Sequence, residues 1–583
     1  MEKADASTLP VLQEAAKNTL QALSKQEQFN LISSRLQRTK AEALYFPLLA
    51  QAGNDKAINK LVEAYKKPAT EDVAYAALLD VNNTEVTEIL YDIASKNATR
   101  RDGALKRYLQ LVNNSSLNDI DKYLRFSKAL ELNPSTEVTN IAIDHLSDII
   151  SLPSLALVSK YMDTPKSSVE AAGAVKYLVS KQPALNGGDE VKGYLEKAKA
   201  VFAAQTDADS GYAVDEIKGM LQQTAPTGFK TLVDNAAVEN RVALPGKYEN
   251  FELYFEYQTT GTAEVNLRSM AILGLHSKKG SKVYAQDYES QPLNGWNSIY
   301  VKVVNDRLQL VENGVKVLDN AVIKNNLEGR AINNEGIISW WKGEGETCLR
   351  NVMVNELPST PVYVLSDEEK KAGFEVLFDG RSLEKWHGNT INYVPQDGTI
   401  YVSAGYGNNG NLYTNQKYSD FVYRFEFCFL EPGVNNGIGI RTKDGVDAAY
   451  DGMEIQVLDH DDPIYKGLRP YQEQGSVYGI IVPKHVNFEG VGVWNTEEIR
   501  AVGDHITVTV NGEVITDGNI REACQGHNVA PDGSKNNPYT VDHLNHPGLF
   551  NKDGYISFCG HGEGVKFRNI RILDLSKKKT KKK

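Results

Sequence analysis

The sequence predicts a multidomain protein in which an all-α array of helical repeats is followed by two β-sandwich domains. Short amphipathic helical patterns recur from about residue 18 to residue 223. From about Pro226 the pattern changes to alternating strands joined by Asn-Gly turns, and this part contains the same segments twice. A chain of 583 residues is too long for a single hydrophobic core, which agrees with several domains.

The helical part shows its periodicity most clearly in residues 55–66, where apolar side chains recur at helical spacing after the break Gly53-Asn54. Further helices are predicted to begin near Thr84, Thr136 and Ser167. Helix pairs that cannot bury their faces alone stack into a solenoid, and residues 1–225 resemble a HEAT-like repeat array. An irregular helical domain is the alternative. In both cases we expect a spacer or a protein-contact surface.

The strand-rich part contains two copies of one plan. Four segments recur in the same order, namely Gly228–Asp234 and Gly373–Asp379, Asn250–Glu256 and Asp420–Glu426, Trp296–Gly314 and Trp494–Gly512, and Gly336–Val352 and Gly554–Ile570. Many strands with Asn-Gly hairpin turns and no intervening helices predict a sandwich or jelly roll. We assign residues 226–358 to a degenerate first copy, 365–576 to a catalytic-type second copy, and 577–583 to a basic disordered tail.

The duplication acts as an internal control, because a residue present in both copies is expected to serve the fold. Trp296 and Trp494, the Asn-Gly turns, and the pairs Arg350-Asn351 and Arg568-Asn569 belong to this group. A residue present in one copy is a better candidate for chemistry. In an ungapped alignment of the two copies, Ala271 and Leu273 occupy the positions of Glu454 and Gln456. His276 then aligns with Asp459, and Gly343 aligns with His561. We therefore expect the site in the second copy.

The strand around Glu454 alternates, so Glu454 and Gln456 share the face opposite Met453, Ile455 and Val457. A solvated strand face is the alternative for this carboxylate. The candidate residues are Glu454 and His561 as general acid or base, Gln456 and Asp459 as hydrogen-bonding or second acidic groups, Arg441 as an oxygen-binding cation, and Tyr478 as a phenol lining a cleft. A loop role for His561 and a packing role for Tyr478 remain open alternatives.

No metal signature is present. The four cysteines form no CxxC pair, and the groups Asp542, His543, His546 and His460, Asp461, Asp462 have no ligand spacing specific to a metal. We therefore assign no metal-binding residues. A divalent cation is the one cofactor that stays possible. The net charge of −11 argues against nucleic acid as the main partner.

The start Met1–Asp5 is polar and does not resemble a signal peptide, and no apolar run is long enough to span a membrane. The chain is therefore either intracellular or a mature form without its leader.

Residues Gly373–Leu575 resemble the 3-keto-disaccharide hydrolase family. The motifs that carry the resemblance are Gly373–Gly380, Asn435–Arg441, Gly452–Asp459, Trp494–Thr496 and Gly560–Gly562. The resemblance implies a concanavalin-like jelly roll acting on glycosides whose C3 hydroxyl is oxidised, often in a protein exported to the periplasm or cell envelope. A ketone at C3 acidifies the C2 proton, so a base such as Glu454 or His561 could remove it and the C1 oxygen could then leave. An oxidised oligosaccharide is the expected partner, and the helical array could hold a protein partner.

Two other functions fit the same residues. Glu454–Asp459 is similar to the Glu-x-Asp-x-x-Glu strand of jelly-roll β-glucanases, with Gln456 in place of the central acid. Retaining hydrolysis needs two carboxyl groups about 5–5.5 Å apart. The other alternative is a sugar-binding or envelope scaffold protein without catalysis.

Overall fold

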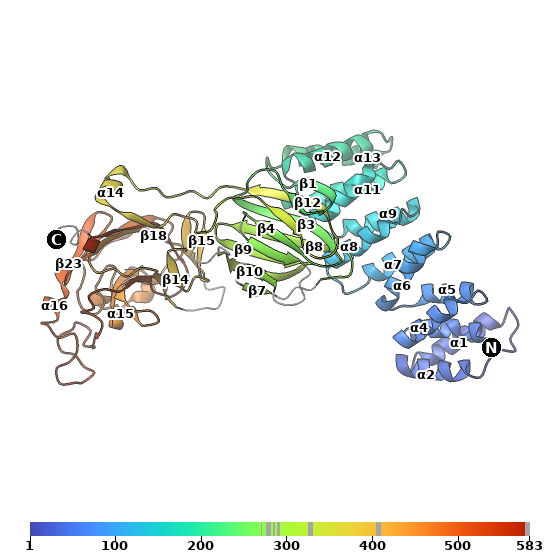
Figure 1. The fold of residues 1–583 in the computed structure, drawn as a ribbon, viewed down its shortest axis with the longest axis horizontal. Helices are drawn as coiled ribbons and strands as arrows, with labels where there is room; N and C mark the ends of the chain where they lie inside the picture. The colour runs from blue at the N-terminus through green and yellow to red at the C-terminus, as the bar shows by residue number, and fades with distance from the viewer. Residues whose placement is uncertain are drawn as a thin grey trace.

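The computed structural model describes residues 1–269, 271–275, 281–283, 286–288, 292–324, 330–403 and 410–577. Three bodies follow one another in an elongated arrangement (Figure 1). A curved helical array lies at one end, one β-sandwich lies in the middle, and a second β-sandwich lies at the other end. The predicted fold class, helical array followed by two sandwiches, is confirmed.

The first body consists of helices α1 to α13, which pack around one continuous core. The bounds of these helices are α1 Leu9–Leu20, α2 Lys25–Leu36, α3 Phe46–Ala52, α4 Asp55–Tyr65, α5 Glu71–Asp80, α6 Thr87–Lys96, α7 Arg101–Asn113, α8 Asp119–Leu130, α9 Thr136–Ser147, α10 Leu152–Lys160, α11 Ser168–Lys181, α12 Gly188–Ala203 and α13 Ala208–Gln222. The assignment of these helices to the HEAT class stays a prediction.

Helix α4 illustrates why the sequence forms these elements. The Asn54 side chain caps the helix by accepting from the Ala57 amide, and Gly53 ends the preceding helix with a φ of +56°. The side chains buried in α4 are Ala57, Ile58, Leu61 and Ala64, at the predicted helical spacing. The break and the cap predicted at Gly53-Asn54 are both confirmed.

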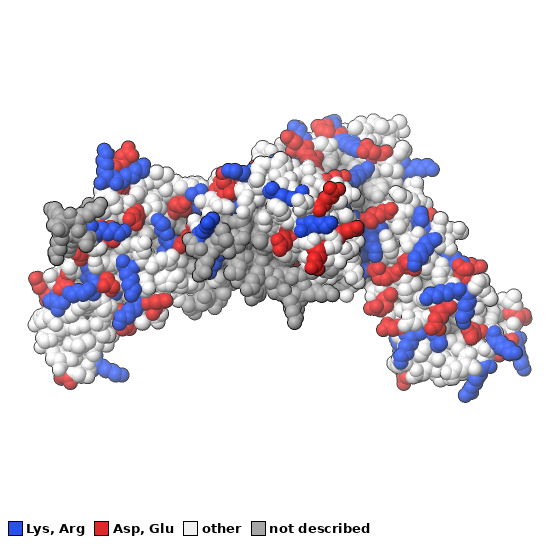
Figure 2. All heavy atoms as spheres, viewed as in Figure 1, with Lys and Arg blue, Asp and Glu red and all other residues white. Residues whose placement is uncertain are grey.

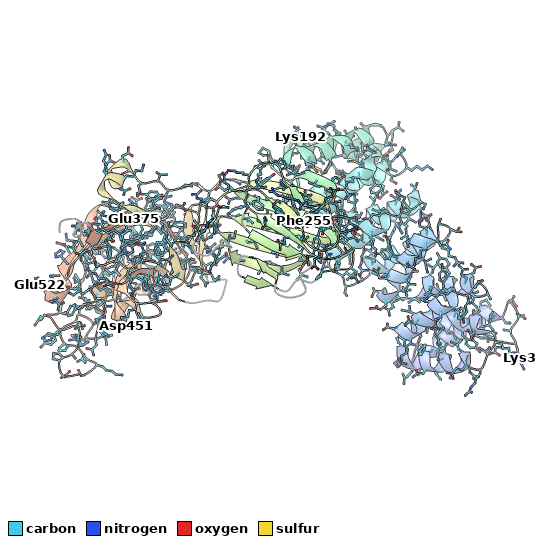
Figure 3. The ribbon with its side chains drawn as sticks, viewed as in Figure 1. Lys3, Lys192, Phe255, Glu375, Asp451 and Glu522 are labelled. Carbon is cyan, nitrogen blue, oxygen red and sulfur yellow. The ribbon has the colours of Figure 1, made fainter. Side chains whose placement is uncertain are left out.

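The first sandwich packs a six-stranded sheet of order β1-β12-β3-β8-β9-β10 against a four-stranded sheet of order β2-β11-β4-β5. Its strands, including the separate pair β6 and β7, are β1 Lys230–Ala237, β2 Arg241–Ala243, β3 Asn250–Thr259, β4 Ala263–Leu267, β5 Ala271–Leu275, β6 Ser281–Val283, β7 Gln286–Tyr288, β8 Asn297–Val304, β9 Arg307–Glu312, β10 Val315–Val322, β11 Ser339–Lys342 and β12 Thr347–Leu357. Phe255, labelled in Figure 3, belongs to the core between these sheets.

The second sandwich repeats this order. Its larger sheet contains β25-β18-β21-β22-β23 where the first has β12-β3-β8-β9-β10, and its smaller sheet has the order β14-β17-β24-β19-β20. The elements are α14 Asp367–Ala372, β13 Glu375–Phe378, β14 Trp386–Gly388, β15 Tyr393–Gln396, β16 Thr399–Val402, β17 Leu412–Thr414, β18 Phe421–Phe429, β19 Asn435–Thr442, α15 Ala448–Asp451, β20 Met453–Leu458, β21 Trp494–Val502, β22 His505–Val510, β23 Glu513–Asn519, α16 Ile520–Ala523, β24 Tyr555–Phe558 and β25 Val565–Asp574. All the paired strands within these two sheets are antiparallel.

The shared residues serve the fold, as the duplication predicted. In the first copy Arg350 stacks on Trp296 at 4.1 Å and donates to Glu256, and in the second Arg568 stacks on Trp494 at 3.9 Å and donates to Glu426. The Asn-Gly turns are also matched. Nδ2 of Asn313 donates to Asn297 at 2.9 Å, and Nδ2 of Asn511 donates to Asn495 at 2.8 Å.

The outer faces of the two large sheets differ. In the first copy this face carries Tyr254 and Met353, which pack on Ala156 of α10, and Tyr123 of α8 donates to Glu256 at 2.7 Å. The helical array is therefore docked on the first sandwich. In the second copy Arg424 and Arg571 occupy this face and donate to Glu369 of the short helix α14.

The two sandwiches are joined by polar contacts. Nη2 of Arg307 donates to the carbonyls of Thr390 and Tyr393 at 2.7 and 2.9 Å, and the Asp306 carboxylate accepts from the Leu383 amide at 3.0 Å. Figure 2 shows acidic and basic side chains interspersed over the visible face of all three bodies. In the part of the chain that the structure describes, every helix is too short or too polar to cross a membrane.

Candidate functional site

Strand β20 carries Glu454 and Gln456 on one face of the smaller sheet of the second sandwich. Glu454 pairs with Gly439 and Gln456 pairs with Gly437 on the neighbouring strand β19. Every residue of β20 is buried, which argues against the alternative of a solvated strand face. A chain segment adds to the open edge of β20, because the Gly475 and Tyr478 amides donate to the Gln456 and Glu454 carbonyls at 2.8 and 3.0 Å.

Glu454 and His561 are brought together from segments that are distant in sequence. Nε2 of His561, on the loop after β24, lies 3.1 Å from Oε1 of Glu454. The Glu454 side chain is only 5% exposed, whereas the His561 side chain is 43% exposed. The histidine is therefore the member of the pair that meets solvent, with the carboxylate behind it.

Gly437 makes room for this carboxylate. A Cβ atom added to Gly437 would lie 2.0 Å from Oε1 of Glu454, a distance that no side chain can tolerate. Gly437 was not among the predicted site residues, although the Gly437-Ile438-Gly439 pattern could have indicated a close approach of another group to the strand.

The electrostatics of the pair follow from its geometry. The hydrogen bond to Glu454 raises the pKa of His561 above its ordinary value, the Asp447 carboxylate acts in the same direction, and burial opposes both. Burial and the neighbouring Glu454 carboxylate raise the pKa of the Cys559 thiol well above its usual range. A protonated His561 and an ionised Glu454 therefore stabilise each other.

Tyr478 lies on the segment that covers β20. Its backbone amide donates to the Glu454 carbonyl, and its phenol oxygen accepts from Nε2 of Gln472 at 3.1 Å. Burial raises the pKa of Tyr478, and the Glu454 carboxylate adds to this effect. The structure thus brings the predicted residue Tyr478 beside the predicted residue Glu454.

The short helix α15 lies near the same pair, since the carboxylate of its capping residue Asp447 acts on His561. Asp447 caps the short helix α15 by accepting from the Ala449 amide at 3.0 Å. The Ala449 carbonyl accepts from Nδ1 of the buried His546 at 2.7 Å, and Nε2 of His546 bonds to Asp542 at 3.0 Å. The loop 520–553 therefore fixes α15, whose last residue Asp451 is labelled in Figure 3.

Arg441 does not lie at the site. Its Nε and Nη1 donate to the Ser419 and Gly503 carbonyls at 2.9 and 2.7 Å, and its side chain is 2% exposed. Arg268 of the first copy binds the Glu249 and Asn305 carbonyls in the same way. The expectation of an oxygen-binding Arg441 is corrected, because this arginine fills the same place in both sandwiches.

Asp459 and Gln456 are also used within the protein. The Asp459 carboxylate accepts from the Gly433 amide at 2.9 Å, so it serves a turn and does not join Glu454 in a carboxylate pair. Nε2 of Gln456 donates to the Asn435 side chain at 2.7 Å, and Gln456 is 4% exposed. Both side chains are therefore already bonded within the protein, and this arrangement does not present them to a substrate as predicted.

One group of described side chains has ligand atoms close enough together to hold a metal ion. His460, Glu473 and His485 have ligand atoms within 4.8 Å of one another. However, His460 donates from Nε2 to the Val486 carbonyl at 2.7 Å and accepts at Nδ1 from the Gln474 amide at 3.1 Å. His546 likewise has both ring nitrogens in hydrogen bonds. While these bonds are kept, neither His460 nor His546 has a ring nitrogen free to bind a metal.

The register between the two copies differs by one residue from the ungapped alignment. Leu267, next to Arg268, pairs with Ala271, and Ile440, next to Arg441, pairs with Met453. Ile272 therefore corresponds to Glu454, and Gly274 corresponds to Gln456. Gly343 still corresponds to His561, because Ser339 pairs with Asn266 as Ser557 pairs with Gly439. Met270 and His276, used in that alignment, lie outside the described residues.

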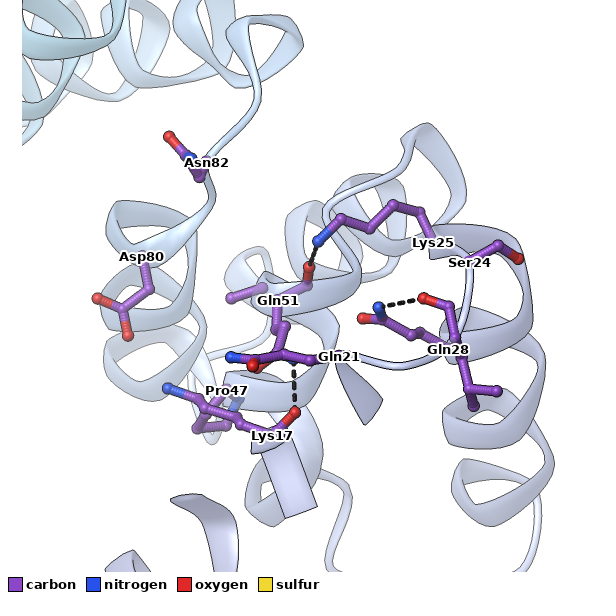
Figure 4. A pocket seen from close by; sticks show the side chains of 11 residues that line it. Lys17, Gln21, Ser24, Lys25, Gln28, Pro47, Gln51, Asp80 and Asn82 are labelled. Carbon is purple, nitrogen blue, oxygen red and sulfur yellow. Dashed lines mark hydrogen bonds between the residues drawn. The ribbon is translucent and has the colours of Figure 1, made fainter. Parts of the chain in front are cut away.

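The helical array contains a separate hollow of about 630 Å³ among α1, α2, α3 and the end of α5 (Figure 4). Its polar lining consists mainly of amide side chains and the two lysines Lys17 and Lys25, and Nζ of Lys25 donates to the Gln51 carbonyl. This lining contains no paired acid and base.

Comparisons with known proteins place the second sandwich among carbohydrate-active relatives. Residues 373–573 match the family model described as a 3-keto-alpha-glucoside-1,2-lyase-like domain. A 3-keto-disaccharide hydrolase of Bacteroides thetaiotaomicron is 27% identical over 229 residues, which cover 34% of this chain and 78% of that protein. These two matches confirm the family resemblance predicted for this part of the chain.

Solved structures give further similarities. A candidate glycosyl hydrolase from Parabacteroides distasonis is 25% identical, with 35% of this chain and 99% of that chain covered and a TM-score of 0.30. A second one from this organism is 23% identical, with 36% and 98% covered and a TM-score of 0.31. A carbohydrate-binding module from Bacillus subtilis is 12% identical, with 28% and 83% covered and a TM-score of 0.18.

Proposed function

We propose that the second sandwich cleaves the glycosidic bond of 3-keto-glycosides by removing the C2 proton and eliminating the C1 substituent. The observation that carries the proposal is the 3.1 Å contact between a half-exposed His561 and a buried Glu454, in the copy that matches the family model. The relative from Bacteroides thetaiotaomicron supports the substrate class. The first copy has Gly343 and Ile272 at the corresponding positions and acts as a structural unit.

In the first step His561 acts as the base. An ionised Glu454 accepts from Nε2–H, which leaves Nδ1 of the neutral ring to take the proton from C2 of the sugar. The electron pair of the C2–H bond moves into the C2–C3 bond, and the C3 carbonyl becomes an enolate oxygen. Glu454 then lies against an imidazolium ring and stabilises its charge.

In the second step the enolate collapses and the C1–O bond breaks. The electron pair of that bond goes to the departing oxygen, and the imidazolium of His561 returns its proton there. Addition of water across the resulting C1–C2 double bond completes a net hydrolysis. We assign Tyr478 to substrate binding, because its phenol has a hydrogen to donate while its oxygen accepts from Gln472.

The mechanism predicts exchange of the C2 proton with solvent. A methyl 3-ketoglucoside, which has a poor leaving group, is incubated with the enzyme in deuterium oxide, and the C2 proton signal is followed by NMR. The signal is expected to disappear faster with the native chain than in buffer, and at the buffer rate with His561→Ala. Cleavage that keeps the original C2 proton would show that elimination is the wrong mechanism.

Two broader assignments belong to the same proposal. The family resemblance supports action on sugars in the periplasm or cell envelope. The helical array docks on the outer face of the first sandwich, through contacts such as Tyr123 to Glu256, and leaves the second sandwich uncovered by helices α1 to α13. The helical array could therefore bind a protein partner without blocking the Glu454–His561 pair.

A further inference from the structure

The crevice between the two sandwiches is a second place where a ligand could bind. It has a volume of about 790 Å³, within the range of roughly 300–1,000 Å³ typical of ligand sites. Its lining comes from β8, β9 and β10 of the first sandwich, from the linker 357–361, and from β15 and the turn after it in the second. In Figure 1 this place lies where β15 meets β9.

The lining of the crevice combines apolar and polar side chains. Aliphatic and proline side chains contribute apolar surface, among them Leu308, Leu357, Pro361 and Val394. Amide and charged side chains are also present, among them Lys302, Gln309, Asp319, Gln396 and Asp397. An apolar surface bordered by a few donors and acceptors is complementary to a pyranose ring, which has C–H faces and a border of hydroxyl groups.

The charges of the crevice favour a neutral ligand. The lining contains Lys302 together with the carboxylates Asp319 and Asp397, and Nζ of Lys302 lies 3.7 Å from Oε1 of Glu252, so the rim has no excess of positive charge. Arg307, the other cation of the lining, is 6% exposed and donates from Nη2 to two backbone carbonyls of the second sandwich. An acidic glycan or a phosphate would therefore find no unengaged cation pair to bind it.

The side chains at the rim are positioned by their neighbours. Nε2 of Gln309 donates to Asp319 at 3.3 Å, and Asp319 also accepts from Nζ of Lys316 at 2.9 Å. Gln396 is exposed at the end of β15, on the opposite wall. A ligand held between Gln309 and Gln396 would contact both sandwiches at once.

We propose that this crevice is a non-catalytic binding site for neutral oligosaccharides. It lies outside the Glu454–His561 pair, and its ligand is recognised by hydroxyl groups, without any requirement for a C3 ketone. Bound sugar bridges the two sandwiches and stabilises their contact. The site thus extends the chain's interaction with carbohydrate beyond the proposed reaction.

The test is calorimetric titration of the full chain carrying Glu454→Gln with maltotriose and with cellotriose, at up to about 10 mM so that a Kd of about 1 mM is visible. One of the two sugars is expected to bind, and Gln309→Ala combined with Gln396→Ala is expected to weaken that binding at least 10-fold. The exposed Gln205 of the helical array provides a matched control, and Gln205→Ala is expected to leave the Kd unchanged.

Two outcomes overturn the inference. One is the absence of binding by both sugars, and the other is binding that the double glutamine variant does not weaken. Neither outcome bears on the proposed reaction, because cleavage of a 3-keto-glycoside by the native chain is measured separately. Binding at the crevice without any cleavage would support the inference and contradict the proposed function.

Discussion

Nε2 of His561 lies 3.1 Å from Oε1 of Glu454, and this hydrogen bond raises the pKa of the histidine. The imidazole of His561 must be neutral to accept a proton, so kcat/KM for a 3-keto-glycoside should rise with pH through the raised pKa of His561. Glu454→Gln removes the negative charge that raises this pKa. We expect the rise in the profile to move to lower pH and the maximum to fall roughly 100-fold.

The control for this profile is Glu513→Gln, which changes an exposed glutamate on β23. Its pH profile should coincide with that of the native chain. An unchanged position of the acid limb in Glu454→Gln would mean that the pair does not set the protonation of the catalytic base.

Gly437→Ala tests the space that the carboxylate needs. The added methyl group would collide with Oε1 of Glu454, and displacement of Glu454 by about 1 Å is expected to lower kcat/KM roughly 10- to 100-fold. Steady-state kinetics on a 3-keto-glycoside measure the effect. Gly173→Ala is the matched control, because a Cβ atom at that helical position meets no atom within 4 Å. Equal activity of both variants would contradict the assigned position of Glu454.

Arg441→Met should lower stability without a specific effect on substrate binding. The substitution removes the hydrogen bonds to the Ser419 and Gly503 carbonyls and the ion pair with Asp420 at 3.5 Å. We expect the free energy of unfolding to fall by about 3 kcal/mol. Urea denaturation followed by tryptophan fluorescence measures the loss, with the exposed Arg500→Met as control. A raised KM at native stability would restore a role of Arg441 in substrate binding.

Glu497 predicts a pH-dependent stability of the second sandwich. Burial raises the pKa of Glu497 from 4.5 to about 8, so the folded chain keeps a proton that the unfolded chain loses. Its contribution to stability is fully present below pH 4.5, is lost as the pH rises to about 8, and changes by at most about 1.4 kcal/mol per pH unit.

Thermal unfolding at pH 5.5, 6.5 and 7.5 measures this dependence. The Tm of Glu497→Gln should fall less with rising pH than the Tm of the native chain, because the amide cannot ionise. Parallel falls in Tm for the two proteins would show that Glu497 is not the group responsible.

The sequence was sufficient for the parts of the fold that depend on local pattern. The helical spacing of Ala57, Ile58 and Leu61 and the cap at Asn54 are confirmed, because they follow from one turn of helix. The duplication is confirmed by the matched partners of Trp296 and Trp494. These features require no knowledge of distant contacts.

The site was predictable only in part, because its geometry depends on contacts between distant segments. Glu454 and His561 are 107 positions apart and meet as expected. The burial of β20 by residues 474–478 and the use of Arg441 by two backbone carbonyls depend on loop conformations that no periodicity encodes. The one-residue error in the register between the copies arose because an ungapped alignment cannot detect a change in the length of a connection.

The most direct test of the proposed function is the release of nitrophenol from two substrates, p-nitrophenyl glucoside and its 3-keto form. The native chain is expected to release nitrophenol from the keto form only, and Glu454→Gln and His561→Ala are each expected to reduce that release strongly. Release from the unoxidised glucoside at a comparable rate would contradict elimination. Binding of both compounds without release from either would show that the second sandwich binds sugar and does not cleave it.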